Sequence, residues 1–440
     1  MWKYIGIEDH ENFGYQFHSQ NLGSTQRSVV RALVVKLSQS SPRRTAKMSL
    51  CRKVAIFATH PIQYHIPWYQ KLSREEGVKV KVYYSAILDP AQQGKGFGVD
   101  FQWDIPLFEG YEWEVLPNWR ASPDLSGFFS SIPRNIIRIL KRDKPDVVVL
   151  TGWQQWPLLH VLFASALLRI PRIVRGESNA MKPRQVWVKI VHRLLLTAYD
   201  AFLAIGISSR EFYIQYGIKN ELIFPCRYFV DNERFEAGAA RLEGRLAELR
   251  EQWFIPQEKA CFLFSGKLIE KKRIFDVIEA LNYVVAEESN VHLLVVGVGE
   301  LLDQAKSLVR KYDLPVTFAG FLNQSEVISA YAVADCLVLP SDYGETWGLV
   351  VNEAMACGKP AIVSDRVGCA PDLVENDITG YQYPFGDTRS LADKMLRIVS
   401  DRSKTDVMGR NARQRVLSRY SVDKAVKGTL RAIDSVLGDL

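Results

Sequence analysis

Short runs of β-branched and aliphatic residues alternate with amphipathic helical patterns from residue 53 to the end of the chain. Each apolar run is only a few residues long, and turn residues such as glycine bound many of them. The predicted strands are residues 54–57, 78–84, 147–150, 172–174, 201–204, 260–265, 291–296, 316–318, 336–340 and 360–363. Because strands that alternate with helices build βαβ units, the sequence predicts an α/β protein with parallel sheets.

The alternating pattern falls into two halves, and the 440 residues are enough for two or three domains. We therefore predict two Rossmann-like parallel-sheet domains that face a cleft. Residues 48–235 form the first domain and residues 258–420 the second, joined by a charged linker at residues 236–257. Residues 421–440 have the apolar spacing of a helix, which we expect to return to the first domain.

Residues 1–47 differ from the rest of the chain because they are polar, rich in Ser, Gln and Arg, and weakly periodic. We expect them to be a disordered extension or a mis-called start before Met48, and a small helical regulatory arm is the alternative. No stretch approaches the ~18 apolar residues of a transmembrane helix. The six scattered cysteines favour reduced thiols and a cytoplasmic location.

The net charge of +7 fits an anionic substrate or an anionic membrane surface. Nucleic-acid binding is not expected, because the sequence has no zinc-finger spacing, RNA-binding signature or long basic run. Residues 182–193 (KPRQVWVKIVHR) mix basic and aromatic residues at helical spacing. They predict either a packed helix with a solvated basic face or a helix that lies on the inner face of the membrane.

Two lysines follow the predicted strand at residues 260–265. Lys267 and Lys272 lie in a loop and the first helical turn after Gly266, where cations and a helix N-terminus can hold phosphates. Such charges stabilise a diphosphate leaving group as its bond to a sugar breaks. Taken alone, the same residues are equally well explained as a solvated turn.

Two carboxylates follow the strand at residues 336–340. Glu345 lies in the loop and Glu353 in the next helix, and Gly348 between them lets backbone N–H groups face a ligand. Carboxylates accept hydrogen bonds from sugar hydroxyls. We expect the two acids and the two lysines to line one slot between the domains.

Residues 341–358 (SDYGETWGLVVNEAMACG) resemble the donor-binding signature of family 4 retaining glycosyltransferases, which have the two-Rossmann-domain B fold. Further segments resemble that family in the same order. They are residues 229–235, 264–273, 294–300, 318–322, 360–368 and 378–381. The similarity is highly specific from residue 229 onward and weak before it.

The resemblance implies a metal-independent enzyme without a cofactor, in which Lys272, Glu345 and Lys267 are catalytic. Retention would follow from front-face attack, with the leaving phosphate as the base. The implied donor-binding residues are Gly266, Lys267, Lys272, Gly297, Phe321, Leu322, Glu345, Thr346, Trp347, Gly348, Leu349 and Glu353. The chain departs from the family at Lys267, where arginine is usual, at Trp347 and at Arg273.

The loop after the first strand lacks the family's glycine pair and instead carries His60, Gln63 and His65. Polar groups directly after a first parallel strand face the crevice, so we predict acceptor-side roles for these three residues. The alternative is that the histidines cap a helix and that Tyr64 and Trp68 belong to the core.

Arg175 and Glu177 follow another predicted strand, where the family often has a histidine near the reacting sugar. We predict that they also lie on the acceptor side, and a structural bridge between them is the alternative. The glycine-rich segment 94–98 has no phosphate fingerprint and predicts a mobile acceptor loop or a plain surface loop.

These features predict a glycosyltransferase that moves a hexose-type sugar from a nucleotide diphosphate to a glycan or lipid-linked acceptor in surface polysaccharide biosynthesis. Two alternatives remain: a nucleotide-sugar-binding protein without turnover, and a nucleotide-sugar epimerase of the same fold.

Overall fold

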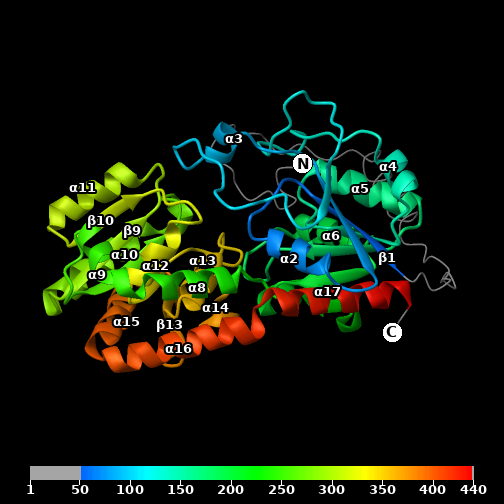
Figure 1. Cartoon of the computed structure of the whole chain (residues 1–440). Helices are drawn as coiled ribbons and strands as arrows, with labels where there is room; N and C mark the ends of the chain where they lie inside the picture. The colour runs from blue at the N-terminus through cyan, green and yellow to red at the C-terminus, as the bar shows by residue number, and fades with distance from the viewer. Residues whose placement is uncertain (1–50, 439–440) are drawn as a thin grey trace.

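The computed structural model describes residues 51–438 and contains two parallel β-sheets, each in its own lobe and covered by helices on both faces (Figure 1). The predicted α/β fold with two Rossmann-like domains is confirmed. The expectation for residues 1–47 lies outside the described residues.

The first sheet has seven parallel strands in the order β3-β2-β1-β4-β5-β6-β7. Its strands are β1 (Arg52–Ala58), β2 (Val78–Tyr84), β3 (Glu112–Val115), β4 (Val147–Leu150), β5 (Arg172–Gly176), β6 (Ala201–Ala204) and β7 (Ile223–Pro225). Its helices are α2 (Ile66–Leu72), α3 (Pro90–Gly94), α4 (Ile136–Asp143), α5 (Trp156–Leu167), α6 (Val186–Leu196) and α7 (Ile207–Gln215).

The second sheet has six parallel strands in the order β10-β9-β8-β11-β12-β13. Its strands are β8 (Ala260–Ser265), β9 (Val291–Val296), β10 (Val316–Gly320), β11 (Cys336–Leu339), β12 (Ala361–Ser364) and β13 (Gly380–Tyr383). Its helices are α10 (Ile274–Glu287), α11 (Leu302–Tyr312), α12 (Val327–Val333), α13 (Leu349–Ala356), α14 (Ala370–Leu373), α15 (Thr388–Ser400) and α16 (Arg402–Arg419).

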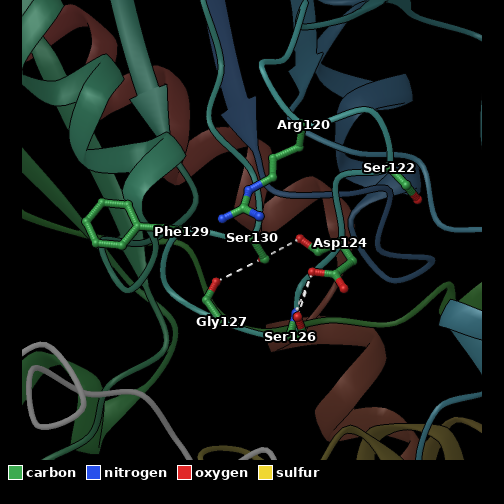
Figure 2. A pocket seen from close by; sticks show the side chains of 7 residues that line it. All are labelled: Arg120, Ser122, Asp124, Ser126, Gly127, Phe129 and Ser130. Atoms are coloured by element: carbon green, nitrogen blue, oxygen red, sulfur yellow. Dashed lines mark hydrogen bonds between the residues drawn. The ribbon is translucent and has the colours of Figure 1, made fainter.

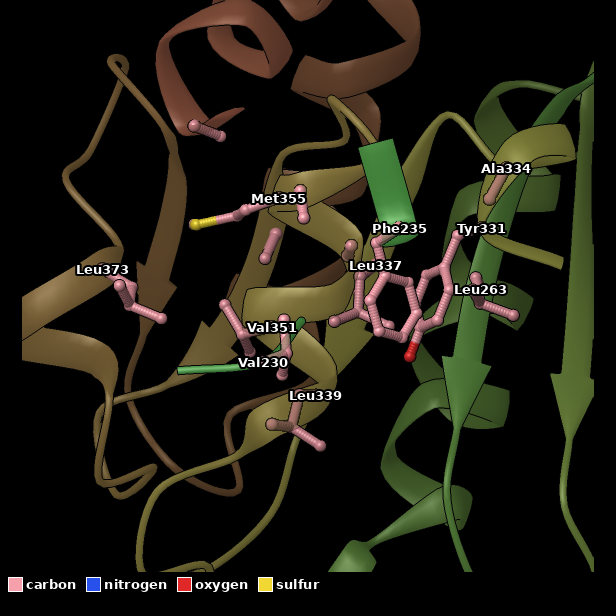
Figure 3. Close-up of a cluster of buried hydrophobic side chains, with 14 of the residues drawn as sticks. Val230, Phe235, Leu263, Tyr331, Ala334, Leu337, Leu339, Val351, Met355 and Leu373 are labelled. Atoms are coloured by element: carbon pink, nitrogen blue, oxygen red, sulfur yellow. The ribbon is translucent and has the colours of Figure 1, made fainter. Parts of the chain in front are cut away.

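Both sheets are buried on both faces, which explains why their strands are continuous apolar runs and not alternating ones. The central strands β4, β8 and β11 are buried at every position. One core cluster of the second domain packs Leu263 and Leu337 from the sheet against Phe235, Tyr331 and Met355 from the helices (Figure 3).

The expected linker region is largely helical. The helices α8 (Asn232–Leu242) and α9 (Leu246–Gln252) pack against α12, and α8 also packs against α13. The last helix, α17 (Val422–Leu437), leaves the second domain and packs on α2, β6 and β7 of the first, as predicted (Figure 1).

Three elements of the first domain were not predicted. The strands β3 and β7 are the two edges of the sheet. β3 interrupts its apolar residues with two glutamates, and β7 is only three residues long and ends in Pro225, so neither has the long apolar run of a central strand. The five-residue helix α3 is too short for periodicity to reveal it, and it depends on a capping box between Asp89 and Gln92.

Candidate functional site

The carboxyl ends of β8, β9 and β10 lie together on the side of the second sheet that faces the first domain, and each is closed by a glycine. Gly297 has φ 125°, and a Cβ there would lie 2.0 Å from the carbonyl oxygen of Gly266. Only glycine permits this backbone approach. The strand ends therefore form a tight backbone edge beside the two predicted lysines.

Lys272 and Glu345 form an ion pair at this edge. Lys272 ends a short 3₁₀ turn (Glu270–Lys272), and Glu345 lies in the loop after β11. The side chains keep only 13% and 15% of their accessible surface. Burial acts to raise the pKa of Glu345, but the charges of Lys272 and Lys271 outweigh it and hold that pKa below its usual value. Glu345 is therefore ionised at neutral pH.

The turn after Glu345 has two residues whose positions are fixed by packing, Trp347 and Gly348. Gly348 has φ 101° and begins α13, and a Cβ there would lie 2.9 Å from Leu339 Cδ2. The indole of Trp347 is 3% exposed and donates to Asn352 Oδ1 at 2.8 Å. Trp347 is thus a core residue, and the predicted contact through the backbone of Thr346 to Leu349 remains a prediction.

Glu353 is buried inside α13, and both of its oxygens accept hydrogen bonds from tyrosines. Tyr331 Oη donates to Oε2 at 2.6 Å, and Tyr64 Oη from the first domain donates to Oε1 at 2.9 Å. Burial raises the pKa of Glu353, although both tyrosine hydroxyls act to lower it. A ribose hydroxyl that reached this carboxylate would have to replace one of the tyrosines.

Lys267 contacts the first domain. Its ammonium donates to the carbonyl oxygen of Lys95 at 3.2 Å and lies 4.0 Å from the ring centroid of Phe97. Phe321, one of the implied donor-binding residues, packs on Phe97 and Phe101 of the same first-domain segment. Leu322 is partly buried against the core of the second domain.

Three of the predicted acceptor-side residues meet in one buried cluster. Arg175 Nη1 lies 2.9 Å from His65 Nε2, and its guanidinium stacks 4.5 Å from the ring centroid of Tyr228. Because a guanidinium can only donate, His65 Nε2 accepts and the ring is neutral. Burial and the charge of Arg175 both lower the pKa of His65, in agreement with that state.

Glu177 is the exposed member of this cluster. Its side chain keeps 35% of its surface, whereas His65 and Arg175 keep 1% and 0% as residues. Burial acts to raise the pKa of Glu177, but the charge of Arg175 and the hydroxyl of Tyr228 outweigh it and lower that pKa to about 2. Tyr228 Oη also donates to this carboxylate. Both the predicted Arg175–Glu177 bridge and a carboxylate that is open to solvent are therefore present.

The other two predicted acceptor-side residues are half-buried in the loop after β1. His60 Nδ1 lies 2.9 Å from Thr59 Oγ1. Trp68 is fully buried, as the alternative interpretation of this loop expected, whereas Tyr64 reaches across to Glu353. His65 occupies the N-cap of α2 but makes no side-chain capping bond.

Direct contacts join the acceptor-side cluster to the donor-side turn. Asn179 Nδ2 donates to the carbonyl oxygen of Thr346 at 3.2 Å, and Asn352 Nδ2 donates to the carbonyl oxygen of Tyr228 at 3.3 Å. Asn179 is two residues from Glu177, and Thr346 follows Glu345. The two carboxylates therefore belong to segments that touch across the domain boundary.

A polar hollow of about 330 Å³ lies in the long loop after β3. Figure 2 shows the guanidinium of Arg120 pointing into it, with Asp124 opposite. Ser126 and Ser130 hold the loop through hydrogen bonds to Asp124 and Gly127. A carboxylate, a guanidinium, hydroxyls and the ring of Phe129 are groups that can bind sugar hydroxyls and the apolar face of a sugar ring.

Sequence reasoning missed Tyr228 and Tyr331, and it considered Tyr64 only as a core residue. Each hydroxyl belongs to an aromatic side chain in an otherwise apolar stretch, so no local signal separates it from a core tyrosine. Residues 51–438 contain no group of three or more His, Cys, Asp or Glu side chains that could hold a metal ion. In the same range, no helix has the length and apolar character that crossing a membrane requires.

Residues 247–415 match the family model described as glycosyl transferases group 1. These residues contain the Lys272–Glu345 pair, Glu353 and most of the second domain.

Curated relatives align over part of the chain. The N-acetyl-alpha-D-glucosaminyl L-malate synthase of Bacillus anthracis is 31% identical over 41% of this chain and 47% of that protein. The chain thus spans about half the length of this relative. The capsular polysaccharide biosynthesis glycosyltransferase CapM of Staphylococcus aureus is 28% identical over 65% of this chain and 76% of that protein.

Solved structures share the fold over nearly the whole chain. A glycosyltransferase from Rickettsia africae has a TM-score of 0.70 at 16% identity and covers 89% of this chain and all of its own. Anabaena HepE, crystallised with UDP and glucose, has a TM-score of 0.65 at 18% identity and covers 86% of this chain and 98% of its own.

Proposed function

We propose that this chain, whose residues 247–415 match the family model described as glycosyl transferases group 1, is a retaining and metal-independent glycosyltransferase. It moves a hexose-type sugar from a nucleotide diphosphate to a glycan or lipid-linked acceptor. The observation that carries this proposal is the Lys272–Glu345 ion pair at the cleft-facing end of the second sheet.

The pair suits a reaction in which negative charge develops on a diphosphate. A cation about 4 Å from that charge contributes about 4 kcal/mol at an effective dielectric constant near 20. Since about 1.4 kcal/mol is a factor of ten in rate, Lys272 alone supplies a useful share of the barrier. Glu345 holds Lys272 in place and offers a carboxylate to the hydroxyls of the transferred sugar.

The donor would lie along the cleft edge of the second domain. Lys267 and Lys272 would bind the diphosphate, the backbone from Thr346 to Leu349 the sugar and phosphate, and Glu353 the ribose. The residues 258–420 carry this site, and the first domain at residues 48–235 carries the acceptor.

On the acceptor side we assign the contact with the acceptor hydroxyl to Glu177. With its pKa near 2, Glu177 stays anionic at neutral pH and can accept a hydrogen bond. His65 and Arg175 are buried behind it and fix its position. The hollow around Arg120 and Asp124 offers further contacts to a glycan.

Two further points belong to the proposal. The named roles of relatives, such as capsular polysaccharide biosynthesis, favour work in surface polysaccharide biosynthesis. The scattered spacing of the cysteines in the sequence favours the cytoplasm, and the basic helix α6 would allow contact with the inner face of the membrane.

The test is Glu345→Gln, assayed with UDP-, GDP-, ADP- and dTDP-sugars by release of the nucleoside diphosphate. We expect turnover to fall by about a hundredfold or more, the usual cost of removing one preorganised electrostatic group. Nucleotide affinity should be kept, because Lys272 loses a competing carboxylate. Glu270→Gln, on the exposed neighbouring turn, is the matched control and should retain activity.

The alternatives give different results in the same assay. A binding protein would show nucleotide affinity but no turnover in the wild type. An epimerase would convert the nucleotide-sugar into an isomer without release of the nucleoside diphosphate. Either outcome would overturn the transferase proposal.

A further inference from the structure

A segment of the first domain, residues 95–104, extends to the second domain beside the predicted donor site. It follows α3, whose N-terminus is fixed by the Asp89–Gln92 capping box. Figure 1 shows α3 and its loop reaching from the first lobe toward the lobe that contains β10. We call residues 95–104 the crossing segment.

Polar contacts fasten the far end of the crossing segment to the loop between β10 and α12. Asn323 Nδ2 donates to the carbonyl oxygen of Gln102 at 2.7 Å. The carboxylate of Asp104 accepts hydrogen bonds from both the backbone N–H and the hydroxyl of Ser325. The segment is thus attached to the second domain by side chains of both domains.

Aromatic rings fill the space between that attachment and Lys267. The centroid of Phe321, at the end of β10, lies 4.4 Å from that of Phe101 and 5.5 Å from that of Phe97. Phe97 in turn lies under the ammonium of Lys267. Trp103 extends the cluster at 4.8 Å from Phe101.

We propose that Phe97 and Phe101 form a first-domain wall of the nucleobase site, so that the base of the donor stacks between this wall and Phe321. This inference rests on the proposed function, because it assumes a nucleoside diphosphate whose phosphates reach Lys267 and Lys272. It adds that the second domain alone does not complete the donor site.

The order of charges and rings along the cleft supports this placement. Lys267 connects the two parts of the site, since its ammonium contacts both Phe97 and the Lys95 carbonyl. A diphosphate would replace that carbonyl as the partner of the ammonium. The base, attached through the ribose, would then enter the ring cluster and exchange ring–ring contacts for ring–base contacts.

The attachment through Asp104 and Asn323 gives the wall its position during this exchange. The rings must separate to admit a base, while the polar contacts at Gln102 and Ser325 keep the segment beside β10. In this proposal, the site for the base is therefore completed when the two domains close.

The experiment measures the binding of two probes to the full chain, by calorimetry or competition. One probe is whichever of UDP, GDP, ADP and dTDP binds the wild type most tightly, and the other is pyrophosphate, which has the charge without the base. The variants are Phe101→Leu and Phe97→Leu, which keep apolar volume but lose the ring. Phe254→Leu is the control, because that ring is 83% exposed in the turn after α9 and belongs to neither the proposed donor site nor the proposed acceptor site.

We expect Phe101→Leu to weaken nucleoside diphosphate binding roughly tenfold, within the range known for base–aromatic stacking, and to leave pyrophosphate binding unchanged. Equal weakening of both probes would show that the segment only closes the cleft, and it would overturn the inference. Unchanged binding of both probes would overturn it as well. If the wild type binds no nucleoside diphosphate, the proposed function itself fails.

Asp104→Ala supplies a second measurement that leaves every ring in place. Loss of the attachment should weaken the binding of the nucleoside diphosphate about as much as Phe101→Leu does. The binding of pyrophosphate should again be unchanged. If Asp104→Ala matches the wild type with both probes, the attachment does not position the wall, and that part of the inference is rejected.

Discussion

The residue with the most unusual environment in the candidate site is Glu353. A carboxylate that is buried needs donors for its oxygens, and this one takes them from Tyr331 within its own domain and Tyr64 across the cleft. In the proposed function, a ribose hydroxyl takes the place of the Tyr64 hydroxyl at Glu353 Oε1. The proposal therefore makes the ligand and the protein compete for this carboxylate oxygen.

This competition predicts opposite effects of Tyr64→Phe on stability and on affinity. Without nucleotide, the buried Glu353 Oε1 loses its donor, which should cost about 1–3 kcal/mol of unfolding free energy. With nucleotide, the ribose restores the donor, so the affinity should rise several-fold. Thermal unfolding with and without the tightest-binding nucleoside diphosphate measures both effects.

Tyr331→Phe is the matched control for this prediction. It removes the other donor to Glu353, but from a tyrosine that the ribose is not expected to replace, so stability should fall without a gain in affinity. A Tyr64→Phe variant that binds nucleotide more weakly than the wild type would instead make Tyr64 a ligand contact.

At the scale of elements, α7 and α14 contact each other at the domain boundary, and the carboxylate of Asp372 links them. Asp372 of α14 accepts hydrogen bonds from the Ile207 amide at the start of α7, at 2.9 Å, and from the Tyr420 hydroxyl, at 3.0 Å. Burial raises the pKa of Asp372 to about 6, although these two donors and Arg227 act to lower it. The junction between the domains is therefore sensitive to pH.

The raised pKa means that the native state binds this proton more tightly than the unfolded state, whose value is 3.8. The resulting stability is fully present below pH 3.8 and is lost as the pH rises through about 6. We expect the difference in unfolding free energy between wild type and Asp372→Asn to change by about 2 kcal/mol from pH 4 to pH 7, with the wild type losing stability. Denaturant unfolding at both pH values measures it.

Asp406→Asn, on an exposed position of α16, controls for the loss of one negative charge and should show no such pH-dependent difference. A constant difference between wild type and Asp372→Asn across this pH range would mean that Asp372 titrates alike in both states.

At the scale of the whole molecule, α17 joins the end of the second domain to the first. It packs on α2, β6 and β7, and the indole of Trp68 donates to Thr429 Oγ1 at 3.2 Å. The contact depends on a close approach, since a Cβ on Gly428 would lie 1.7 Å from the carbonyl oxygen of Pro225. The two domains are thus held together by the return of α17 to the first domain, as well as by direct contacts such as Tyr64–Glu353 and Asn179–Thr346.

The close approach reverses the usual effect of alanine in a helix. Gly428→Ala would normally stabilise a helix by about 1 kcal/mol. Here we expect it to destabilise the protein by about 1–3 kcal/mol, because overpacking against a backbone carbonyl shifts α17 away from β7. Thermal or denaturant unfolding measures the effect.

Gly244→Ala is the comparison, because a Cβ at that position meets no atom within 4 Å. It should raise the unfolding free energy slightly, by about 0.4–1 kcal/mol, because alanine restricts the unfolded chain more than glycine does. A Gly428→Ala variant that is more stable than the wild type would mean that α17 can move without cost.

Much of the second domain could be predicted from the sequence. The strands β8, β9 and β11 are buried on both faces, so their apolar runs are unbroken, and the glycines after β8 and β9 are visible directly. The Lys272–Glu345 pairing also follows from topology, because β8 and β11 are neighbours and their carboxyl ends lie together. Edge strands such as β3 could not be predicted from the sequence, because an exposed strand has no continuous apolar pattern.

The sequence by itself therefore determined the fold class, the two sheets and the donor-side motif, since burial of both sheet faces and the turns at strand ends leave local patterns. Only the tertiary structure decided that Tyr64 reaches Glu353, that Phe101 meets Phe321, and that Arg175 is buried behind Glu177. The first two contacts join residues that are far apart in the chain and in different domains, and Arg175 is buried against His65 and Tyr228, which are also distant from it in the sequence. The contacts between domains depend on how the two lobes sit against each other, which no local periodicity encodes.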